Sequence, residues 1–425
     1  MGRTSDHIHA RNAAEHVVRT LTGAGHVAYF AGGCVRDELL GLTPTDYDVA
    51  TDATPDRITS LFPRTSEVGA HFGVVLVKHR DEVIEVATFR SDGDYSDRRR
   101  PDAVTFSNPR DDAQRRDFTV NALFLDPIAS GPAPEGASVV THPSRGRIID
   151  FVGGISDLEA RTLRAVGDPD KRLAEDHLRA LRAVRLAARL SFIIDPATAE
   201  AIRRHARELQ GVSRERIGEE VRRMAEHPSR AVAAKLIHEL GLEAPVFTWT
   251  GDQGPRTWRV LAALQPESGF AATLAAWALD LGLKPGEETA VVQAWRKALM
   301  LSNDTKAQLS AILNTLPTLE LGWSSLSVAR QKRLAAGPWF SETMNVFHAA
   351  NPTGAAAVEE RLRELAATPS GLWPQPFVSG DDLVALGMKP GPRFKEILDG
   401  VLDAQLEGRV TNREEALELA RRMGV

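Results

Sequence analysis

The sequence predicts an α+β protein, in which a small α/β head over residues 1–150 precedes a chain that is helical from there on. Up to residue 154, short runs rich in β-branched and aromatic residues alternate with helical patterns. From Ser156 onward the apolar residues recur at helical spacing. All seven tryptophans lie between Trp249 and Trp373, which indicates a separately packed helical body.

The elements of the head follow from local patterns. Glycines mark the end of the first expected helix, and Pro55 suits the first turn of the next. A His-Arg-Asp turn separates two β-rich runs, so these two strands are expected to pair. The predicted elements are a helix over 8–25, a strand over 27–31, a helix over 54–62, strands over 73–78 and 83–89, and a strand followed by a hinge over 148–154.

Length and charge narrow the class of protein. A chain of 425 residues is too long for one ordinary core, so about two to four domains are expected. The net charge of −5 excludes a global basic field, although residues 161–230 carry 16 Lys and Arg against 11 Asp and Glu. One cysteine, Cys34, a polar N-terminus and no apolar run of about 18 residues favour a cytoplasmic protein without a membrane partner.

Two adjacent stretches in the head carry the first candidate site. Gly32 and Gly33 precede an amphipathic run, and bare N–H groups at a helix start suit phosphate. Asp46 and Asp48 lie two residues apart in a predicted strand, so their carboxylates are expected on one face. Such a pair of hard oxygen ligands suits Mg²⁺, and a phosphate cradle beside it indicates chemistry on a nucleoside triphosphate.

Glu85 lies within an apolar, β-rich run. A carboxylate in such a place must be paired, hydrogen-bonded or metal-bound. The residues alone leave two alternatives open: a third metal ligand or a structural ion-pair partner.

A second candidate site lies in the helical run from Leu173 to Leu190. Asp176 and Arg179 are three residues apart, hence neighbours on one helix face. A carboxylate only accepts hydrogen bonds and a guanidinium only donates them. Cytosine and adenine each offer an amine donor beside a ring-nitrogen acceptor, whereas uracil and guanine offer the reverse order. The pair therefore predicts selection of C and A.

Five motifs, in order, resemble those of the class II nucleotidyltransferases, which are the tRNA CCA-adding enzymes and bacterial poly(A) polymerases. They are similar to the family's catalytic motif, its ribose and phosphate motif, its interdomain hinge, its base-reading helix and the helix start that braces the reader. The matching residues are Gly32-Gly33-x-Val35-Arg36-Asp37 with Asp46-x-Asp48, then Arg115 to Asn121, Asp150 to Gly154, Glu175 to Arg182, and Ser213 to Ile217.

The resemblance implies a small nucleotidyltransferase head with a mixed β-sheet, followed by all-α neck, body and tail domains over 151–230, 231–370 and 371–425. It implies an enzyme that uses Mg²⁺, CTP and ATP to extend tRNA, with its cleft between head and neck. Asp46, Asp48 and Glu85 would be catalytic, the two aspartates as metal ligands. The implied nucleotide-binding residues are Gly32, Gly33, Arg36 and Arg116 for phosphate, Asp117 for the ribose 2′-OH, Asn121, and Asp176, Arg179 and Arg182 in the base reader.

The loop over residues 92–101 bears on which member of the family this is. Its form argues against an enzyme that adds only CC, and favours CCA addition over poly(A) synthesis. An enzyme that adds only the terminal A remains an open alternative.

Two alternative functions belong to other classes. One is a catalytically silent RNA-binding protein, which the intact aspartate pair disfavours. The other is a transferase acting on small molecules, which the long helical half disfavours.

Overall fold

The computed structural model describes residues 2–67, 73–93, 104–129, 131–142, 145–251 and 256–424. The chain divides into two compact units. The first comprises residues 1–220 and 236–246, and the second comprises residues 221–235 and 247–425. The predicted division into head, neck, body and tail stays a prediction. Within the described residues, no helix combines the length and the apolar character that crossing a bilayer requires.

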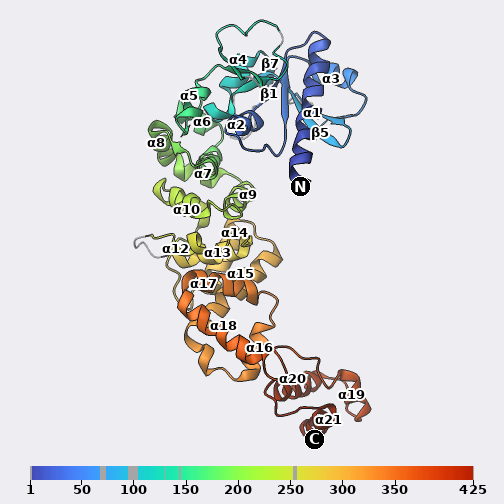
Figure 1. Cartoon of the computed structure of the whole chain (residues 1–425). Helices are drawn as coiled ribbons and strands as arrows, with labels where there is room; N and C mark the ends of the chain where they lie inside the picture. The colour runs from blue at the N-terminus through green and yellow to red at the C-terminus, as the bar shows by residue number, and fades with distance from the viewer. Residues whose placement is uncertain are drawn as a thin grey trace. The chain divides into compact units, whose positions relative to one another are not determined.

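An eight-stranded mixed sheet forms the centre of the first unit (Figure 1). Its order is β3-β4-β5-β2-β1-β8-β10-β9. The pair β2 and β5 is parallel and the other neighbours are antiparallel, which confirms the mixed sheet. The strands are β1 (Ala28–Ala31), β2 (Asp48–Thr51), β3 (Thr65–Glu67), β4 (Val74–His79), β5 (Glu82–Thr88), β8 (Phe124–Asp126), β9 (Ser138–His142) and β10 (Gly146–Asp150).

The parallel pairing places catalytic candidates opposite each other. Asp48 at the start of β2 is the register partner of Glu85 in β5. The predicted pairing of the strands on either side of the His-Arg-Asp turn is confirmed as β4 with β5. Tyr29 of β1, Phe124 of β8 and Phe89 form an aromatic cluster in the core of the head, with ring centroids 5.8–6.2 Å apart.

Short helices connect the strands of the head. The helices predicted over 8–25 and 54–62 are confirmed as α1 and α3, the latter with Pro55 in its first turn. A small separate sheet pairs β6 with β7. These elements are α1 (Gly2–Gly23), α2 (Gly33–Leu39), α3 (Pro55–Leu61), α4 (Pro109–Gln114), the 3₁₀ turn η2 (Thr119–Asn121), β6 (Arg90–Asp92) and β7 (Val104–Phe106).

Helices follow the sheet, as predicted, but the expected continuous helix from Leu173 to Leu190 is wrong. It is two helices, α6 and α7, with a joint at residues 176–178. Asp176 is extended (φ −152°), and its carboxylate accepts a hydrogen bond from the Leu178 N–H at 3.1 Å. Aspartate favours such local turns over helix interiors. The elements are α5 (Gly154–Glu159), β11 (Thr162–Leu163), α6 (Pro169–Glu175), α7 (Arg179–Leu190), β12 (Ile193–Ile194), α8 (Pro196–His205), η3 (Ala206–Gly211), α9 (Arg214–Ala225), α10 (Arg230–Glu239) and α11 (Glu243–Phe247).

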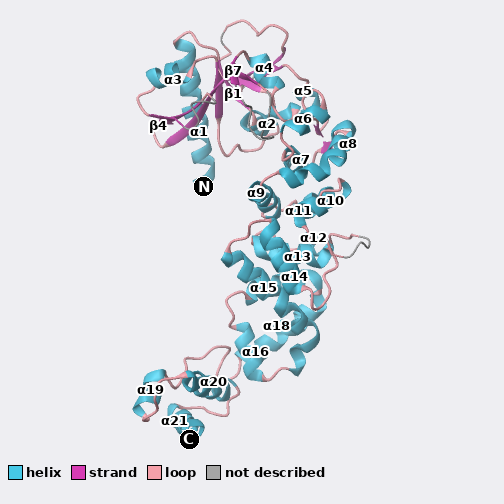
Figure 2. Cartoon of the chain, turned by 180° about the vertical axis from the view of Figure 1, so that it is seen from behind, coloured by secondary structure: helices cyan, strands magenta, loops and turns pink. Residues whose placement is uncertain are grey.

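The described residues of the second unit form helices joined by loops, and no strand is among them (Figure 2). Its last three helices enclose a cluster of their own around Leu383, Ile397 and Val401. The elements are α12 (Arg259–Ala263), α13 (Phe270–Asp280), α14 (Glu288–Ala298), α15 (Asn303–Pro317), the π-turn η4 (Thr318–Gly322), η5 (Trp323–Ser325), α16 (Val328–Ala335), α17 (Phe340–Ala350), α18 (Pro352–Ala366), α19 (Gly380–Ala385), α20 (Pro392–Leu406) and α21 (Arg413–Gly424).

The chain leaves the sheet at the predicted hinge, where Gly154 packs directly on backbone. A Cβ at this position would lie 2.3 Å from the carbonyl oxygen of Thr119. We expect Gly154→Ala to lower the free energy of unfolding by about 1–3 kcal/mol, because the added methyl group would overlap the Thr119 carbonyl unless η2 shifts. Urea denaturation measures the loss. Gly211→Ala, which meets nothing within 4 Å, is the matched control, and equal stability of the two variants would contradict this packing.

Candidate active site

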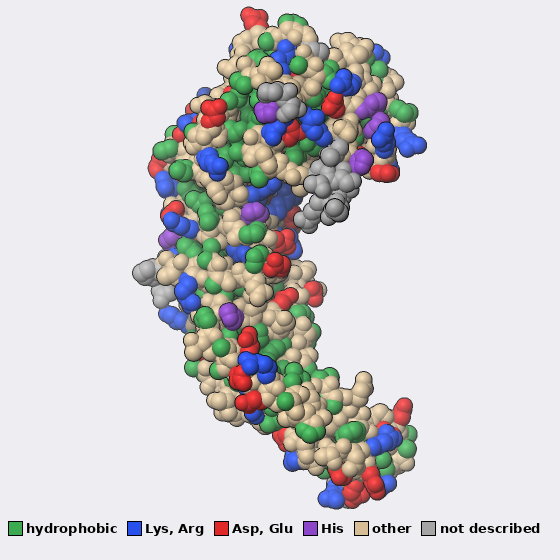
Figure 3. Space-filling view, viewed as in Figure 1, with side chains coloured by type: hydrophobic (Ala, Val, Ile, Leu, Met, Phe, Trp, Pro, Cys, Tyr) green, Lys and Arg blue, Asp and Glu red, His purple; other side chains and the backbone are tan. Residues whose placement is uncertain are grey.

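A cavity of about 670 Å³ opens on the first unit and collects every predicted site residue. On the face drawn in Figure 3, Lys and Arg side chains (blue) gather in a recess beneath the sheet, at the level of α7. The lining includes nine arginines against five carboxylates, so the cavity carries a surplus of positive charge. The twelve predicted residues in the lining are Gly32, Gly33, Arg36, Asp46, Asp48, Glu85, Arg116, Asp117, Asn121, Asp176, Arg179 and Arg182.

The glycine pair forms the turn from β1 into α2. Gly32 has φ +80°, and a Cβ there would lie 2.9 Å from Arg116 Nη1. A side chain at this position would therefore be strained and would displace an arginine from the cavity wall. Glycine thus allows the backbone of the turn and the Arg116 guanidinium to lie close together in the cavity wall.

The acidic wall consists of Asp46, Asp48 and Glu85. The expectation that both aspartates lie in one strand is wrong in part, because β2 begins at Asp48 and Asp46 lies two residues before it. Both nevertheless line the cavity with Glu85. Burial, followed by the charges of Glu85 and Asp46, raises the pKa of Asp48 to about 7.

The acidic wall fits a hard divalent cation. Burial and the charge of Asp46 also raise the pKa of Glu85, so the ionised forms of both Asp48 and Glu85 are disfavoured. An oxygen-ligated cation such as Mg²⁺ would relieve this repulsion. Glu85 lines the cavity beside both aspartates, which favours the metal-ligand alternative over the ion-pair alternative.

A buried aspartate holds two of the cavity arginines. Asp112 is 1 % exposed and accepts hydrogen bonds from Arg115 at 2.7 Å and from Arg116 at 3.0 Å. The predicted phosphate ligand Arg36 is itself buried, and donates to Asp37 at 2.8 Å and to Asn121 at 2.5 Å. The arginines are thus fixed by the protein before any ligand arrives.

Asp117 joins the head to α7. Its Oδ2 accepts two hydrogen bonds from Arg182, at 2.6 and 2.9 Å, and its Oδ1 accepts from the Phe118 N–H and from Asn121. These four bonds use the acceptor sites of the carboxylate. A ribose 2′-OH, the predicted partner of Asp117, would therefore have to replace one of the Arg182 bonds.

We expect Asp117→Asn to destabilise the fold in a pH-dependent way. Burial opposes ionisation, but Arg182 and Asn121 more than offset it and lower the pKa of Asp117 to about 2. This lies below the unfolded value of about 3.9, so the stabilisation is present above pH ~4 and is lost as the pH falls toward 2. The variant should lose about 2–3 kcal/mol of unfolding free energy at pH 7.

Urea denaturation at pH 7 and pH 3 checks this prediction. The difference between the parent chain and Asp117→Asn should shrink to about half at pH 3. Asp81→Asn, in an exposed turn, serves as the control. A difference that is the same at both pH values would show that the ion pair with Arg182 is not its source.

The base-reading pair comes together in a different way from the one expected. Asp176 lies in the joint between α6 and α7, whereas Arg179 begins α7. The prediction that the two residues share one helix face is therefore wrong. Arg179 Nη1 donates to the Arg172 carbonyl and to Glu175, while Arg216 donates to Asp176 at 2.6 Å. Nε and Nη2 of Arg179 make no hydrogen bond to the described residues. Both side chains line the cavity, with an acceptor and a donor available to a base.

Five further arginines line the cavity and were not among the predicted site residues. The four arginines that α7 contributes to the cavity are spaced three, three and four residues apart, so they lie on one face of the helix. That spacing could have identified two of the five from sequence. The five are Arg90, Arg115, Arg185, Arg189 and Arg216.

Comparison with known proteins identifies the family. Residues 28–164 match the poly A polymerase head domain, and residues 191–248 match the probable RNA and SrmB-binding site of polymerase A. The CCA-adding enzyme of Geobacillus stearothermophilus is 34% identical over 409 residues, which cover 94% of each chain. The chain belongs to the family of CCA-adding enzymes. That of Geobacillus thermodenitrificans is 35% identical over 413 residues, again with 94% of each chain covered.

Solved structures of CCA-adding enzymes agree with this assignment. The crystal structure of the Bacillus stearothermophilus CCA-adding enzyme in complex with CTP superposes with a TM-score of 0.76 at 30% identity, over 97% of each chain. The Thermotoga maritima enzyme complexed with tRNA, at 19% identity and a TM-score of 0.69, shares the fold over 96% of this chain and 94% of its own. The predicted family, α+β fold and nucleotidyltransferase class are confirmed. The loop over residues 92–101, whose form in the sequence favours CCA addition, lies largely outside the described residues.

Proposed function

We propose that this chain adds C and A residues to tRNA 3′ ends from CTP and ATP and releases pyrophosphate. The observation that carries the proposal is the gathering of three kinds of group in one cavity. Three carboxylates, a surplus of arginines and the Asp176–Arg179 pair all line it. Its 670 Å³ falls within the usual range for small-molecule sites. CCA-adding relatives covering 94% of the chain support the assignment.

The arginines would bind the triphosphate. Arg115 and Arg116 already have Asp112 as a buried anchor, so their guanidinium groups lose little freedom when a phosphate arrives. Charge-assisted hydrogen bonds from preorganised donors are the means by which proteins stabilise phosphoryl transfer. The glycine turn at Gly32 keeps the backbone close to the same ligand.

The acidic wall would hold Mg²⁺ through Asp46, Asp48 and Glu85. When bound, this ion supplies charge stabilisation at the reacting phosphate and on the departing pyrophosphate. The position of Glu85 opposite Asp48 follows from the parallel pairing of β5 with β2.

The base would be read by side chains alone. Asp176 Oδ1 accepts from Leu178 and Oδ2 from Arg216, so each oxygen keeps one acceptor site. Arg179 supplies the donor. Cytosine and adenine match this order, while uracil and guanine leave both protein groups unpaired, at a cost of about 1–3 kcal/mol each.

The proposal is tested with purified protein, Mg²⁺ and three tRNAs, ending before CCA, after C and after CC. Each is given CTP, ATP or both. Addition of the three residues in order supports the proposal. Incorporation of A alone, on the CC-ended tRNA only, would make the chain an A-adding enzyme. Long A tails would make it a poly(A) polymerase, and no incorporation would favour a silent RNA-binding protein. Transfer to small hydroxyl acceptors without RNA would contradict all of these.

A further inference from the structure

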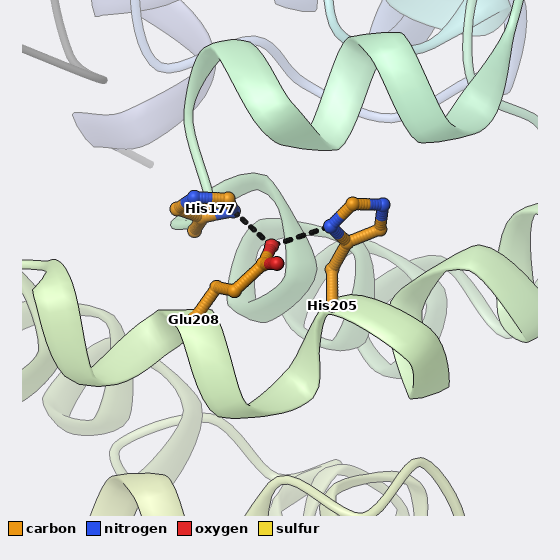
Figure 4. Close-up of side chains that lie close together, drawn as sticks. All are labelled: His177, His205 and Glu208. Carbon is orange, nitrogen blue, oxygen red and sulfur yellow. Dashed lines mark hydrogen bonds and ion pairs between the residues drawn. The ribbon is translucent and has the colours of Figure 1, made fainter.

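Two histidines and a glutamate converge at a place that the proposed reaction does not use. His177 lies in the joint between α6 and α7, His205 ends α8, and Glu208 lies in η3 (Figure 4). One ligand atom from each of the three residues lies within 4.8 Å of the other two. His177 is buried, at 4 % exposure, while Glu208 reaches the surface.

Both imidazoles turn the same nitrogen to one carboxylate oxygen. The distances to Glu208 Oε2 are 3.4 Å from His177 Nδ1 and 2.5 Å from His205 Nδ1. The two rings are stacked, with centroids 6.1 Å apart. Three potential ligand atoms this close together require a cation or protons between them, because their lone pairs repel.

The second nitrogen of His205 is held by another carboxylate. Its Nε2 lies 3.0 Å from Asp170 Oδ1, and Asp170 is itself bound by Arg204 at 2.7 Å. If Nε2 carries the proton for this bond, Nδ1 presents its lone pair toward Glu208. A carboxylate on the far nitrogen is the common arrangement around metal-binding histidines, since it fixes the tautomer and the ring.

We propose that His177, His205 and Glu208 form a binding site for a divalent transition-metal ion, with Zn²⁺ as the best match. Two imidazole nitrogens and one carboxylate oxygen are a ligand set that Zn²⁺ takes in proteins, with water in the fourth position. Imidazole suits Zn²⁺ and its neighbours in the transition series, whereas Mg²⁺ prefers the all-oxygen wall formed by Asp46, Asp48 and Glu85. The ion would fasten the joint between α6 and α7 to η3.

The test uses Co²⁺, whose four-coordinate sites with nitrogen ligands absorb strongly in the visible range. Full-length protein is titrated with Co²⁺ in excess Mg²⁺, which keeps the oxygen-only wall occupied. We expect one equivalent to bind with visible bands, and Zn²⁺ to abolish the bands. Asp170→Asn, which removes the carboxylate behind His205, should weaken binding about 10–100-fold. His205→Gln and Glu208→Gln remove a ligand and should weaken binding by at least as much.

His26→Gln is the matched control. His26 also pairs with a carboxylate, Asp52, at 3.1 Å, and neither residue belongs to the proposed site. This variant should bind Co²⁺ as the parent chain does. Unchanged melting temperatures of metal-free His205→Gln and Glu208→Gln show that they fold. The proposal is overturned if the parent chain gives no visible bands, or if the two variants take up Co²⁺ as tightly as His26→Gln.

Discussion

Asp48→Asn is expected to lower the rate of nucleotide addition at least ~10³-fold, because it removes a charged ligand of the proposed Mg²⁺ site from the acidic wall. The fold should survive. Burial and the charges of Glu85 and Asp46 already disfavour the ionised form of Asp48 and raise its pKa to about 7. A neutral side chain of the same shape removes that repulsion, so the melting temperature of the metal-free variant should equal or exceed that of the parent chain.

Single-turnover addition of C to a tRNA lacking CCA measures the rate, and thermal unfolding with and without Mg²⁺ measures binding of the ion. The parent chain should gain stability on addition of Mg²⁺, and Asp48→Asn should gain much less. Asp56→Asn, an exposed carboxylate of α3, is the control for lost charge. Near-normal activity of Asp48→Asn would disprove the assignment of the acidic wall.

Asp176→Ala should relax the choice of nucleotide more than it slows the reaction. In the proposed site the Asp176 carboxylate accepts a hydrogen bond from the exocyclic amine of cytosine, and uracil leaves this carboxylate unpaired. The variant lacks the carboxylate and so loses this distinction. Its preference for CTP over UTP should fall about 5–150-fold, the equivalent of one unpaired group. The measurement is the ratio of kcat/KM for the two nucleotides on a tRNA lacking CCA.

Arg203→Ala controls for the loss of a charged side chain in the same part of the first unit, since Arg203 on α8 lies outside the cavity. Arg179→Ala should relax the preference by a similar factor, through loss of the donor. If Asp176→Ala keeps the parent preference for CTP, the base is recognised by other groups, even if the overall rate falls.

Local patterns predicted five of the eight strands, which are β1, β2, β4, β5 and β10, but not β3, β8 or β9. The twelve cavity residues were predicted partly from local patterns, as for Asp46 and Asp48, and partly from the family resemblance, as for Asp117. β4 and β5 are joined by a short turn, which fixes their pairing. The predicted start of one strand is wrong, because Asp46 lies two residues before β2, although it lines the cavity with Asp48. The parallel pairing of β2 with β5 joins segments far apart along the chain, and no local pattern encodes it.

The joint between α6 and α7 could not be predicted from periodicity. Apolar and arginine residues continue at helical spacing through residues 173–190, and only the Asp176 side chain interrupts the helix, by binding the backbone two residues on. The network around Asp117 was hidden for a related reason. Its main partner, Arg182, is 65 residues away in sequence, so the occupied acceptor sites of this carboxylate are visible only in three dimensions.

On the proposed function, in which both CTP and ATP are substrates, the joint has a consequence for how bases of different size are accepted. The pairing edge of a purine lies farther from its sugar than that of a pyrimidine. An acceptor fixed on a helix face could follow this difference only if the whole helix tilted. Asp176 instead sits on extended backbone between two helices, held laterally by Arg216 of α9. Rotation of this one side chain would move the acceptor without tilting either helix, whereas Arg179 is held by the Arg172 carbonyl and by Glu175.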